Sequence, residues 1–238
     1  MVDGSNRLEA GDQSYFLQGW QTYRKVRDLD YIFLREVYAA LHRALTEDAP
    51  RPFRFLDVGC GDSVATVGAL RGTEVGRYVG IDLSRALLDL AEAEVAGLDC
   101  PIALVEGDYR SALADWPDAV DVVWIGQSLH HMNSDEKLPV MRQVRCILAP
   151  GGLFLIWEPT SLPGEDRTGW MIRAEAYIAT WSGLDTDERR IVVEHGWASD
   201  HPEAAARWLE LGQRAGFARG QALLEAPPGL CQVFCFHA

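Results

Sequence analysis

The stretch Phe55-Leu-Asp-Val-Gly-Cys-Gly-Asp-Ser63 decides the fold of this chain. It continues an apolar run, Phe53–Val58, and leads into a helical pattern, so it predicts a strand, a tight turn and a helix. Gly59 and Gly61 allow the backbone to turn sharply and to approach a ligand closely. The N-terminus of the next helix offers backbone N–H groups to a negatively charged group. The stretch therefore predicts a ligand-binding loop.

The glycine spacing of this loop narrows the kind of ligand. A dinucleotide fingerprint requires glycine at positions 59, 61 and 64, and position 64 is Val64. This disfavours a pyrophosphate ligand. An acidic residue, Asp57, instead stands two residues before the first glycine.

A regular alternation of strands and helices extends outward from the loop. Further apolar runs predict buried strands at Tyr78–Ile81, Ile102–Val105, Val120–Ile125 and Leu153–Trp157. Helical patterns lie between the strands, near residues 63–71, 84–96 and 134–148. Strands that alternate with helices predict a mostly parallel sheet with helices on both faces.

Three segments outside this alternation complete the predicted architecture. Residues 13–46 indicate one or two helices, which make residues 1–50 an N-terminal helical cap. The main domain, 51–238, contains a helical insertion at about 160–195, which we interpret as a lid near the site.

The chain ends with a helix near 202–215 and an antiparallel hairpin of strands 217–224 and 230–237, joined by a turn at Pro227-Pro228-Gly229. We expect an α/β, Rossmann-like fold with a seven-stranded, mostly parallel sheet whose last strand is antiparallel.

Composition restricts the partners and the compartment. Of the 238 residues, 48% are hydrophobic and 24% are charged, as in ordinary globular proteins. The formal net charge of −13 disfavours nucleic acid and anionic membranes as partners. Five scattered cysteines favour reduced thiols and a cytoplasmic protein. The sequence shows neither a signal peptide nor a membrane-spanning run, and its acidic residues show no metal-ligand spacing.

From about residue 53 to 158, and more weakly to the C-terminus, the sequence resembles the class I S-adenosylmethionine-dependent methyltransferases. The resemblance implies S-adenosylmethionine as cofactor and S-adenosylhomocysteine as product. It also implies that the loop holds the methionine end of the cofactor, through Asp57, Gly59, Cys60 and Gly61. Many members of the family have a third glycine where this chain has Ser63, a small residue that can cap the helix.

The same resemblance assigns residues at the ends of the next strands. It implies that Asp82 binds the ribose hydroxyls of the cofactor and that Asp108 binds the adenine amino group. It also implies that Tyr109 lies beside the adenine ring. Leu83 and Gln127 complete the predicted cofactor set. Taken one at a time, Asp82 can instead be a helix cap and Asp108 a turn residue. The acidic residues nevertheless follow successive strands, where ligands of open α/β sheets bind.

The candidates for catalysis are His130, His131 and His195, together with Glu158 at the end of the fifth predicted strand. Methyl transfer is an in-line displacement that mainly requires alignment, and a base is needed only if the acceptor loses a proton. Histidine suits that role at neutral pH. One of the paired histidines can also cap a helix or pack under the cofactor, and His195 can be a surface residue.

The predicted acceptor is a small molecule. The loop Ile125-Gly-Gln-Ser lacks the acidic or Asn-Pro-Pro-aromatic pattern frequent in methyltransferases of DNA amino groups. Aromatic and apolar residues of the cap and the insertion can form a lid over the acceptor or can pack inward as helix core. They are Tyr15, Phe16, Trp20, Tyr23, Trp170, Met171, Tyr177 and Trp181.

The sequence thus predicts a methyltransferase acting on a small molecule, with an O-methyltransferase that uses a histidine base as one version. The attacked atom stays open among oxygen, nitrogen, sulfur and carbon, and a homodimer is compatible with the sequence. The alternatives are a non-catalytic S-adenosylmethionine-binding module, a nicotinamide-dependent oxidoreductase and, on a related fold, an aminopropyl transferase. The strand-four loop lacks the acidic cluster that an aminopropyl transferase needs for its amine substrate.

Overall fold

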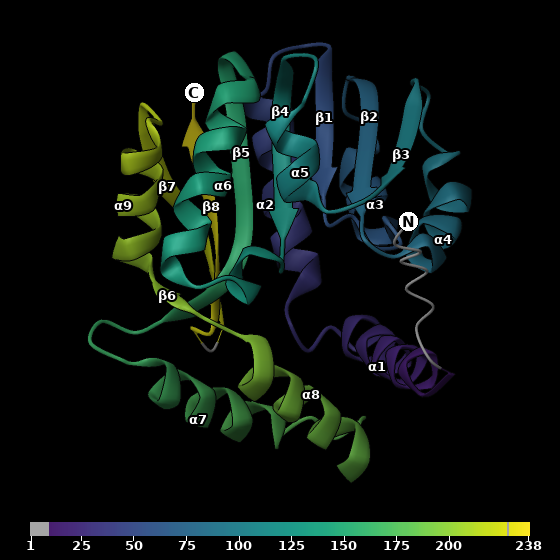
Figure 1. Ribbon diagram of the computed structural model, residues 1–238, viewed down its shortest axis with the longest axis vertical. Coiled ribbons are helices and arrows are strands. Elements are labelled where there is room, and N and C mark those ends of the chain that lie inside the picture. Colours follow the sequence, from purple (N-terminus) through teal and green to yellow (C-terminus); the bar gives the residue numbers. More distant parts are fainter. Residues whose placement is uncertain (1–9, 228) are drawn as a thin grey trace, which may run out of the picture.

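A central sheet forms the body of the molecule, with helices on both faces and a further helical layer beyond one end of the strands (Figure 1). The computed structural model describes residues 10–227 and 229–238, with side chains from residue 19 onward. The strands are β1 (Phe53–Val58), β2 (Val75–Asp82), β3 (Ile102–Glu106), β4 (Val120–Gly126), β5 (Leu148–Ser161), β6 (Glu203–Ala204), β7 (Arg219–Ala226) and β8 (Cys231–His237). The α-helices are α1 (Ala10–Asp28), α2 (Leu34–Glu47), α3 (Val64–Leu70), α4 (Arg85–Val95), α5 (Tyr109–Ala114), α6 (Ser134–Ile147), α7 (Arg167–Ile178), α8 (Thr186–Ser199) and α9 (Ala205–Ala215).

The sheet topology confirms the predicted Rossmann-like class. The strand order is β3-β2-β1-β4-β5-β8-β7, and the sheet has eight strands rather than the predicted seven because the two-residue β6 also pairs with β5. Strands β1 to β5 pair in parallel, and β8 pairs antiparallel with both β5 and β7. The chain therefore forms the predicted hairpin, and its last strand inserts between β5 and β7. The order of the strands reverses between β1 and β4, which is where open α/β sheets bind ligands.

Two hydrophobic cores explain why the central strands are apolar on both faces. One core packs α5, α6 and α9 against one face, through residues such as Leu113, Val144 and Trp208. The other packs α2 and α3 against the opposite face, through residues such as Leu41 and Val67. Burial on both faces requires continuous apolar runs, and those runs made the strands visible in the sequence.

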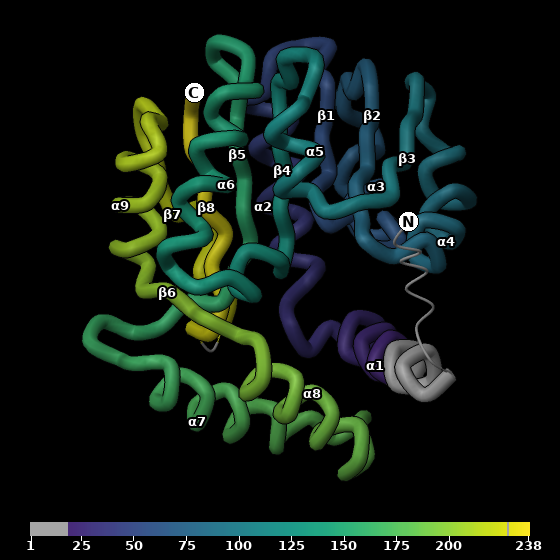
Figure 2. Tube along the Cα trace, in the orientation of Figure 1, coloured from purple at the N-terminus to yellow at the C-terminus, as the bar shows by residue number. Residues whose placement is uncertain are grey.

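The cap and the insertion pack against each other at the carboxyl ends of the parallel strands (Figure 2). Val26 of α1 and Trp181 belong to a small core between α1, α7 and α8. The Trp181 ring stacks on Tyr31 at 5.0 Å between centroids, and the Tyr177 hydroxyl donates to the Tyr31 carbonyl at 2.9 Å. The two helices predicted for the insertion are present, and the second continues to Ser199. The helical layer therefore lies over the edge where ligands of this fold bind.

Several local predictions need correction. Ser63 stands at the start of α3 with φ 56° but makes no capping hydrogen bond, because its hydroxyl lies 2.9 Å from the Tyr78 hydroxyl. The short helix α5 was not predicted, since six residues are too few to show a helical period. Helix α9 begins at Ala205, three residues later than expected, because Glu203 and Ala204 pair with β5.

Two further predictions concern residues that lie partly outside the described part of the chain. The turn at 227–229 includes residue 228, and the side chains of Tyr15 and Phe16 also lie outside the described part. Among the described residues, no helix is long and apolar enough to cross a membrane.

Candidate active site

The glycine loop after β1 has the backbone shape that the sequence predicted. Gly59 and Gly61 adopt φ values of 68° and 55°, the left-handed region that favours glycine. A Cβ on Gly59 would meet the Ser128 hydroxyl oxygen at 3.3 Å. A Cβ on Gly61 would enter open space. The loop thus leaves a cradle that a larger residue would fill.

Asp57 lies beneath this loop rather than on its open side. Its carboxylate is buried and accepts a hydrogen bond from the Tyr78 hydroxyl at 2.9 Å. Burial raises the pKa of Asp57 to about 7, and the hydrogen bond from Tyr78 opposes that shift. The structure therefore places Asp57 as a support of the loop, and it does not line the cavity described below.

Asp82, at the end of β2, faces the glycine loop. One carboxylate oxygen accepts from the Gly61 N–H at 2.9 Å, and the other accepts from the Ser84 N–H at 2.9 Å. The cap of α4 is Ser84, whose side chain accepts from Leu87 N–H. The neighbouring Leu83 is 69% exposed although it is apolar. A carboxylate beside an exposed apolar side chain suits a nucleoside, which has polar hydroxyls and a flat base.

Asp108 and Tyr109 stand apart from this arrangement. Asp108 caps α5 by accepting from the Arg110 N–H at 2.9 Å, and its ion pair with the Arg110 guanidinium lowers the pKa of Asp108. Tyr109 is buried, and its hydroxyl lies 3.4 Å from the Ser128 hydroxyl. Neither residue lines a described cavity, so their role toward adenine stays a prediction.

A cavity of about 320 Å³ opens at the glycine loop. Of the predicted cofactor residues, its walls contain Gly59, Cys60, Gly61, Asp82 and Gln127, whereas the predicted Leu83 does not line it. We call it the cofactor cavity.

Several residues that line the cofactor cavity were not predicted from the sequence. Arg27 of α1 reaches across to Asp62 of the glycine loop, with 2.6 Å between Nη1 and Oδ2. The Trp157 ring is buried, and its Nε1 has no hydrogen-bond partner within the described part of the chain. Asp62 lies within the quoted stretch Phe55–Ser63, whereas nothing in the sequence connected Arg27 or Trp157 with the loop.

A second, larger cavity of about 510 Å³ adjoins the first, under the cap and the insertion. We call it the acceptor cavity. Its walls are mostly aromatic and aliphatic, and among the described residues no lysine or arginine lines it. Six of the predicted lid residues line it: Trp20, Tyr23, Trp170, Met171, Tyr177 and Trp181. Trp170 and Met171 are also buried in a small core. These two residues therefore both line the cavity and pack inward, so the two interpretations do not exclude each other.

The three candidate histidines meet at the wall of the acceptor cavity. His130 and His131 form part of the 3-10 turn Leu129–His131 that follows β4, and His195 comes from α8. The His131 ring lies 4.1 Å from His130 and 5.4 Å from His195, between ring centroids. The turn begins after Gln127, whose φ of 55° is a strained value for a residue with a side chain.

Glu158, in β5, holds the turn that carries the paired histidines through hydrogen bonds. It is fully buried and accepts from the backbone N–H groups of Ser128 and Leu129 at 3.1 and 2.9 Å. Its other oxygen lies 2.7 Å from His130 Nδ1. Glu158 therefore holds both the backbone of the turn and the orientation of one imidazole.

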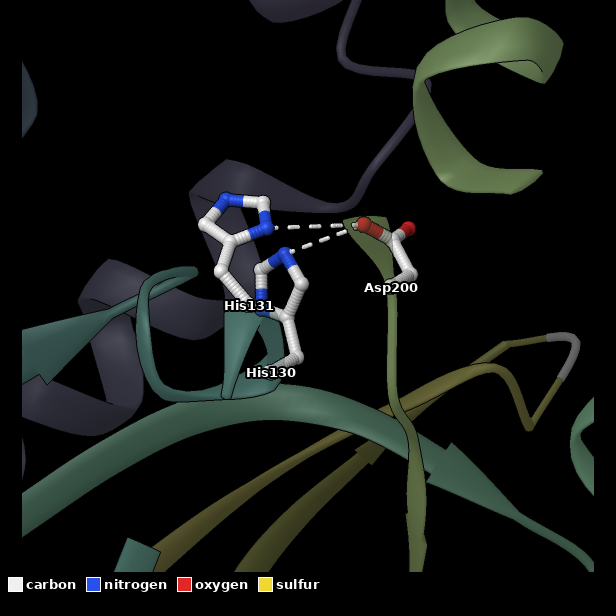
Figure 3. Close-up of side chains that lie close together, drawn as sticks. All are labelled: His130, His131 and Asp200. Atoms are coloured by element: carbon white, nitrogen blue, oxygen red, sulfur yellow. Dashed lines mark ion pairs between the residues drawn. The ribbon is translucent and has the colours of Figure 1, made fainter. Parts of the chain in front are cut away.

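Asp200, just after α8, completes the cluster and was not predicted (Figure 3). Its Oδ1 lies 3.5 Å from His130 Nε2 and 3.7 Å from His131 Nδ1. Burial raises the pKa of Asp200, and the neighbouring His130 opposes that shift. Burial and the adjacent His130 and His195 lower the pKa of His131 to about 3, so this imidazole is neutral at pH 7.

A buried lysine fixes the segment that carries Asp200. Lys137 of α6 is fully buried, and its ammonium donates to the His201 carbonyl at 2.6 Å and to Glu203 at 2.8 Å. The His201 N–H in turn donates to the His130 carbonyl at 2.7 Å. Segments far apart in the sequence are thus held in one rigid cluster.

Comparisons with known proteins agree with this geometry. A family model described as a methyltransferase domain matches residues 55–152. A probable methyltransferase of Aspergillus luteorubrus is 33% identical over 105 residues, which cover 41% of this chain and 37% of that protein. The carboxy-S-adenosyl-L-methionine synthase of Chromohalobacter salexigens is 28% identical over 188 residues, 72% of this chain and 65% of that protein.

The fold is also shared with solved structures. One is the magnesium protoporphyrin IX methyltransferase of Synechocystis PCC 6803 with bound S-adenosylhomocysteine, at a TM-score of 0.62 and 13% identity. The match covers 94% of each chain. At that identity the likeness concerns the fold alone.

The sheet order, the glycine loop and the carboxylate at the end of β2 define a nucleoside-binding α/β protein. The match over residues 55–152, the curated relatives and the shared fold support a methyltransferase domain of the class I S-adenosylmethionine-dependent type, and S-adenosylmethionine is the cofactor of this family. The chain spans between about a third and two thirds of the length of the curated relatives it matches.

The residues of the cofactor cavity fit this cofactor. Gly61 leaves open space where a side chain would stand, and Asp82 offers two carboxylate oxygens beside it. Trp157 Nε1 is a buried donor that lacks an acceptor among the described residues. These groups would hold the cofactor.

Proposed function

We propose that this chain transfers a methyl group from S-adenosylmethionine to a hydroxyl group of a small, uncharged, ring-bearing acceptor, with His131 as the base. The observation that carries the proposal is the position of His131 at the junction of the two cavities. His131 and Gln127 line both, as do Trp20 and Tyr23 of α1. A group in that position can touch an acceptor at the place where it meets the cofactor.

The lining of the acceptor cavity supports the acceptor class. A volume of about 510 Å³ lies within the range of small-molecule sites. Aromatic walls favour flat rings, and a carboxylate acceptor would find no cationic side chain among the described lining residues. The polar groups gather at the histidine cluster, so the acceptor would place its hydroxyl there and its apolar body between α1 and α7.

The chain's own residues supply alignment and proton transfer. When bound, S-adenosylmethionine supplies a methyl group already activated on its sulfonium. Transfer of the methyl group makes the hydroxyl proton strongly acidic, so His131 Nε2 can accept it although burial holds the pKa of His131 at about 3. The neutral imidazole can turn Nδ1–H toward Asp200. The Asp200 carboxylate then stabilises the imidazolium that forms, at 3.7 Å between Oδ1 and Nδ1. The aromatic walls exclude water from the reacting atoms.

The test is a labelled-methyl transfer assay with pairs of acceptors. We expect transfer to uncharged hydroxyl-bearing aromatic compounds and little transfer to their carboxylated analogues. The His131→Gln variant should lower turnover by roughly 100- to 10,000-fold, the usual contribution of general base catalysis. Its dissociation constant for S-adenosylhomocysteine should stay unchanged.

The matched control is His237→Gln. His237 pairs with Leu153 near the start of β5, whereas the site lies at the other end of that strand, beside Glu158. This variant should keep the wild-type rate. A wild-type rate in His131→Gln would remove His131 as the base, and transfer confined to carboxylated compounds would overturn the acceptor class.

The same assay separates this proposal from a non-catalytic binding module, which would bind S-adenosylhomocysteine and transfer no label. Family membership disfavours the nicotinamide-dependent oxidoreductase. The homodimer, the cytoplasmic location and the absence of nucleic acid partners stay predictions from the sequence.

A further inference from the structure

Three metal-ligating atoms converge on one point beside the acceptor cavity. They are His130 Nε2, His131 Nδ1 and Asp200 Oδ1, and all lie within 4.8 Å of one another. Figure 3 shows both imidazole nitrogens directed at the same carboxylate oxygen. The acidic residues alone suggested no metal site, since the carboxylate comes from a segment far from the two histidines in the sequence.

The hydrogen bonds around Glu158 determine which nitrogen of His130 carries a proton. Glu158 accepts from the backbone N–H groups of Ser128, Leu129 and His130, so both of its oxygens act as acceptors. The hydrogen in its 2.7 Å contact with His130 therefore comes from Nδ1. In the neutral imidazole, Nε2 then presents a lone pair.

That lone pair faces another acceptor. His130 Nε2 lies 3.5 Å from Asp200 Oδ1, and this oxygen is buried without a hydrogen-bond partner in the part of the chain that the structure describes. Two facing acceptors repel each other unless a positive group lies between them. A proton on Asp200 or on His130, or a metal ion between the two groups, would remove this repulsion.

The donor set and its support favour a metal. Ligating histidines usually donate their other ring N–H to a carboxylate, as His130 does to Glu158. Four-coordinate metals hold nitrogen and oxygen ligands at about 2.0–2.2 Å, which sets the ligands about 3.3 Å apart. The observed 3.5 and 3.7 Å to the carboxylate require a closure of a few tenths of an ångström, and the two imidazole nitrogens, which lie within 4.8 Å of each other, would also have to approach.

We propose that His130, His131 and Asp200 bind a divalent first-row transition-metal ion such as Zn²⁺. Two imidazoles and one carboxylate suit such ions better than Mg²⁺ or Ca²⁺, which prefer oxygen ligands. All three residues line the acceptor cavity, so the remaining coordination positions face the space for the acceptor.

A metal on His131 has a consequence for the reaction, and this consequence rests on the proposed function. Coordination through Nδ1 leaves the proton of the neutral imidazole on Nε2. The Nε2 atom then donates and cannot accept the acceptor's proton. Metal binding and the base role of His131 are therefore mutually exclusive, and the metal-loaded protein should transfer methyl groups more slowly.

The binding test uses chelator-treated full-length protein titrated with ZnCl₂ against a chromogenic zinc chelator. We expect one tight equivalent in the wild type. His130→Gln and Asp200→Asn should each weaken that equivalent by at least about 100-fold, and Glu158→Gln by about 10- to 100-fold. His237→Gln, far from the cluster, should bind as the wild type does.

Folding of each variant is checked by circular dichroism. His131→Asn serves as a second ligand variant if Glu158→Gln does not fold. Crystals soaked in ZnCl₂ should show an anomalous peak between the three ligand atoms. Equal zinc binding in wild type, His130→Gln and Asp200→Asn, or a peak only elsewhere, would overturn the site.

The effect of zinc on methyl transfer is measured separately from zinc binding. Adding one equivalent of Zn²⁺ should lower the transfer rate of the wild type, and chelator should restore it. Zinc bound at the cluster with an unchanged rate would overturn the effect on the base. If the metal-free protein transfers no methyl group, while the titration still shows zinc binding at the cluster, the proposed function is refuted and the metal site stays supported.

Discussion

The cofactor cavity and the acceptor cavity touch each other but are built in different ways. Most of the cofactor cavity comes from the ends of adjacent parallel strands and the glycine loop between β1 and α3. The acceptor cavity is enclosed by α1, α7, α8 and the end of the β7–β8 hairpin, which are distant in sequence. The first is held by the sheet, and the second by packing between helices. Changes to the two cavities should therefore have separable effects.

The largest expected effect tests whether the cofactor side is a rigid part of the core. Burial raises the pKa of Asp57 to about 7, so the folded chain keeps its proton up to that pH. The unfolded chain loses the proton near pH 4, and folding stability should fall as pH rises from about 4 to about 7. Three units of pKa correspond to about 4 kcal/mol.

The measurement is urea unfolding across that pH range for wild type and Asp57→Asn. An asparagine oxygen can still accept from the Tyr78 hydroxyl, so the variant should fold and should lack this part of the pH slope. Identical slopes in the two proteins would mean that Asp57 is not held protonated beneath the loop.

The next prediction asks whether the two cavities are separable in binding. Asp82→Ala removes the carboxylate that faces the Gly61 N–H and should weaken S-adenosylhomocysteine binding by about 1–3 kcal/mol, or roughly 5- to 150-fold. Isothermal titration measures this. The matched change on the other side is Ile178→Val in the wall of the acceptor cavity, which should leave cofactor affinity unchanged. An unchanged dissociation constant in Asp82→Ala would contradict the ribose role.

The smallest expected effect concerns the helix that joins the two cavities. Arg27 and Asp62 form a half-buried ion pair between α1 and the glycine loop, worth about 1 kcal/mol. Arg27→Met should lower cofactor affinity by about fivefold and also raise the KM for the acceptor, because α1 lines both cavities. A change in only one of the two constants would show that α1 does not couple them.

The sequence anticipated the sheet better than the site. Strand β1 has the predicted limits, and the other strands of the parallel sheet contain their predicted cores. Strands β2 and β5 extend beyond the predictions, because pairing with a neighbour continues after the apolar run has ended. The position of β8 between β5 and β7 could not be predicted from the sequence, because strand order depends on long-range pairing that leaves no local pattern.

The candidate site also contains residues whose placement the sequence predicted and residues whose placement depends on packing. Gly59, Gly61 and Asp82 were predicted and line one cavity, because a strand end and a turn are specified locally. Asp57 and Asp108 were predicted too, but burial directs one beneath the loop and a helix cap engages the other. Burial and side-chain partners are properties of the packed state.

By itself, the sequence determined the alternation of strands and helices, the glycine loop, the family and the paired histidines, because each depends on residues close together in the chain. Only the tertiary structure brought Arg27 to Asp62, and Asp200 and Glu158 to His130. Those contacts depend on how separate segments pack, and packing selects partners by shape and burial rather than by distance along the chain.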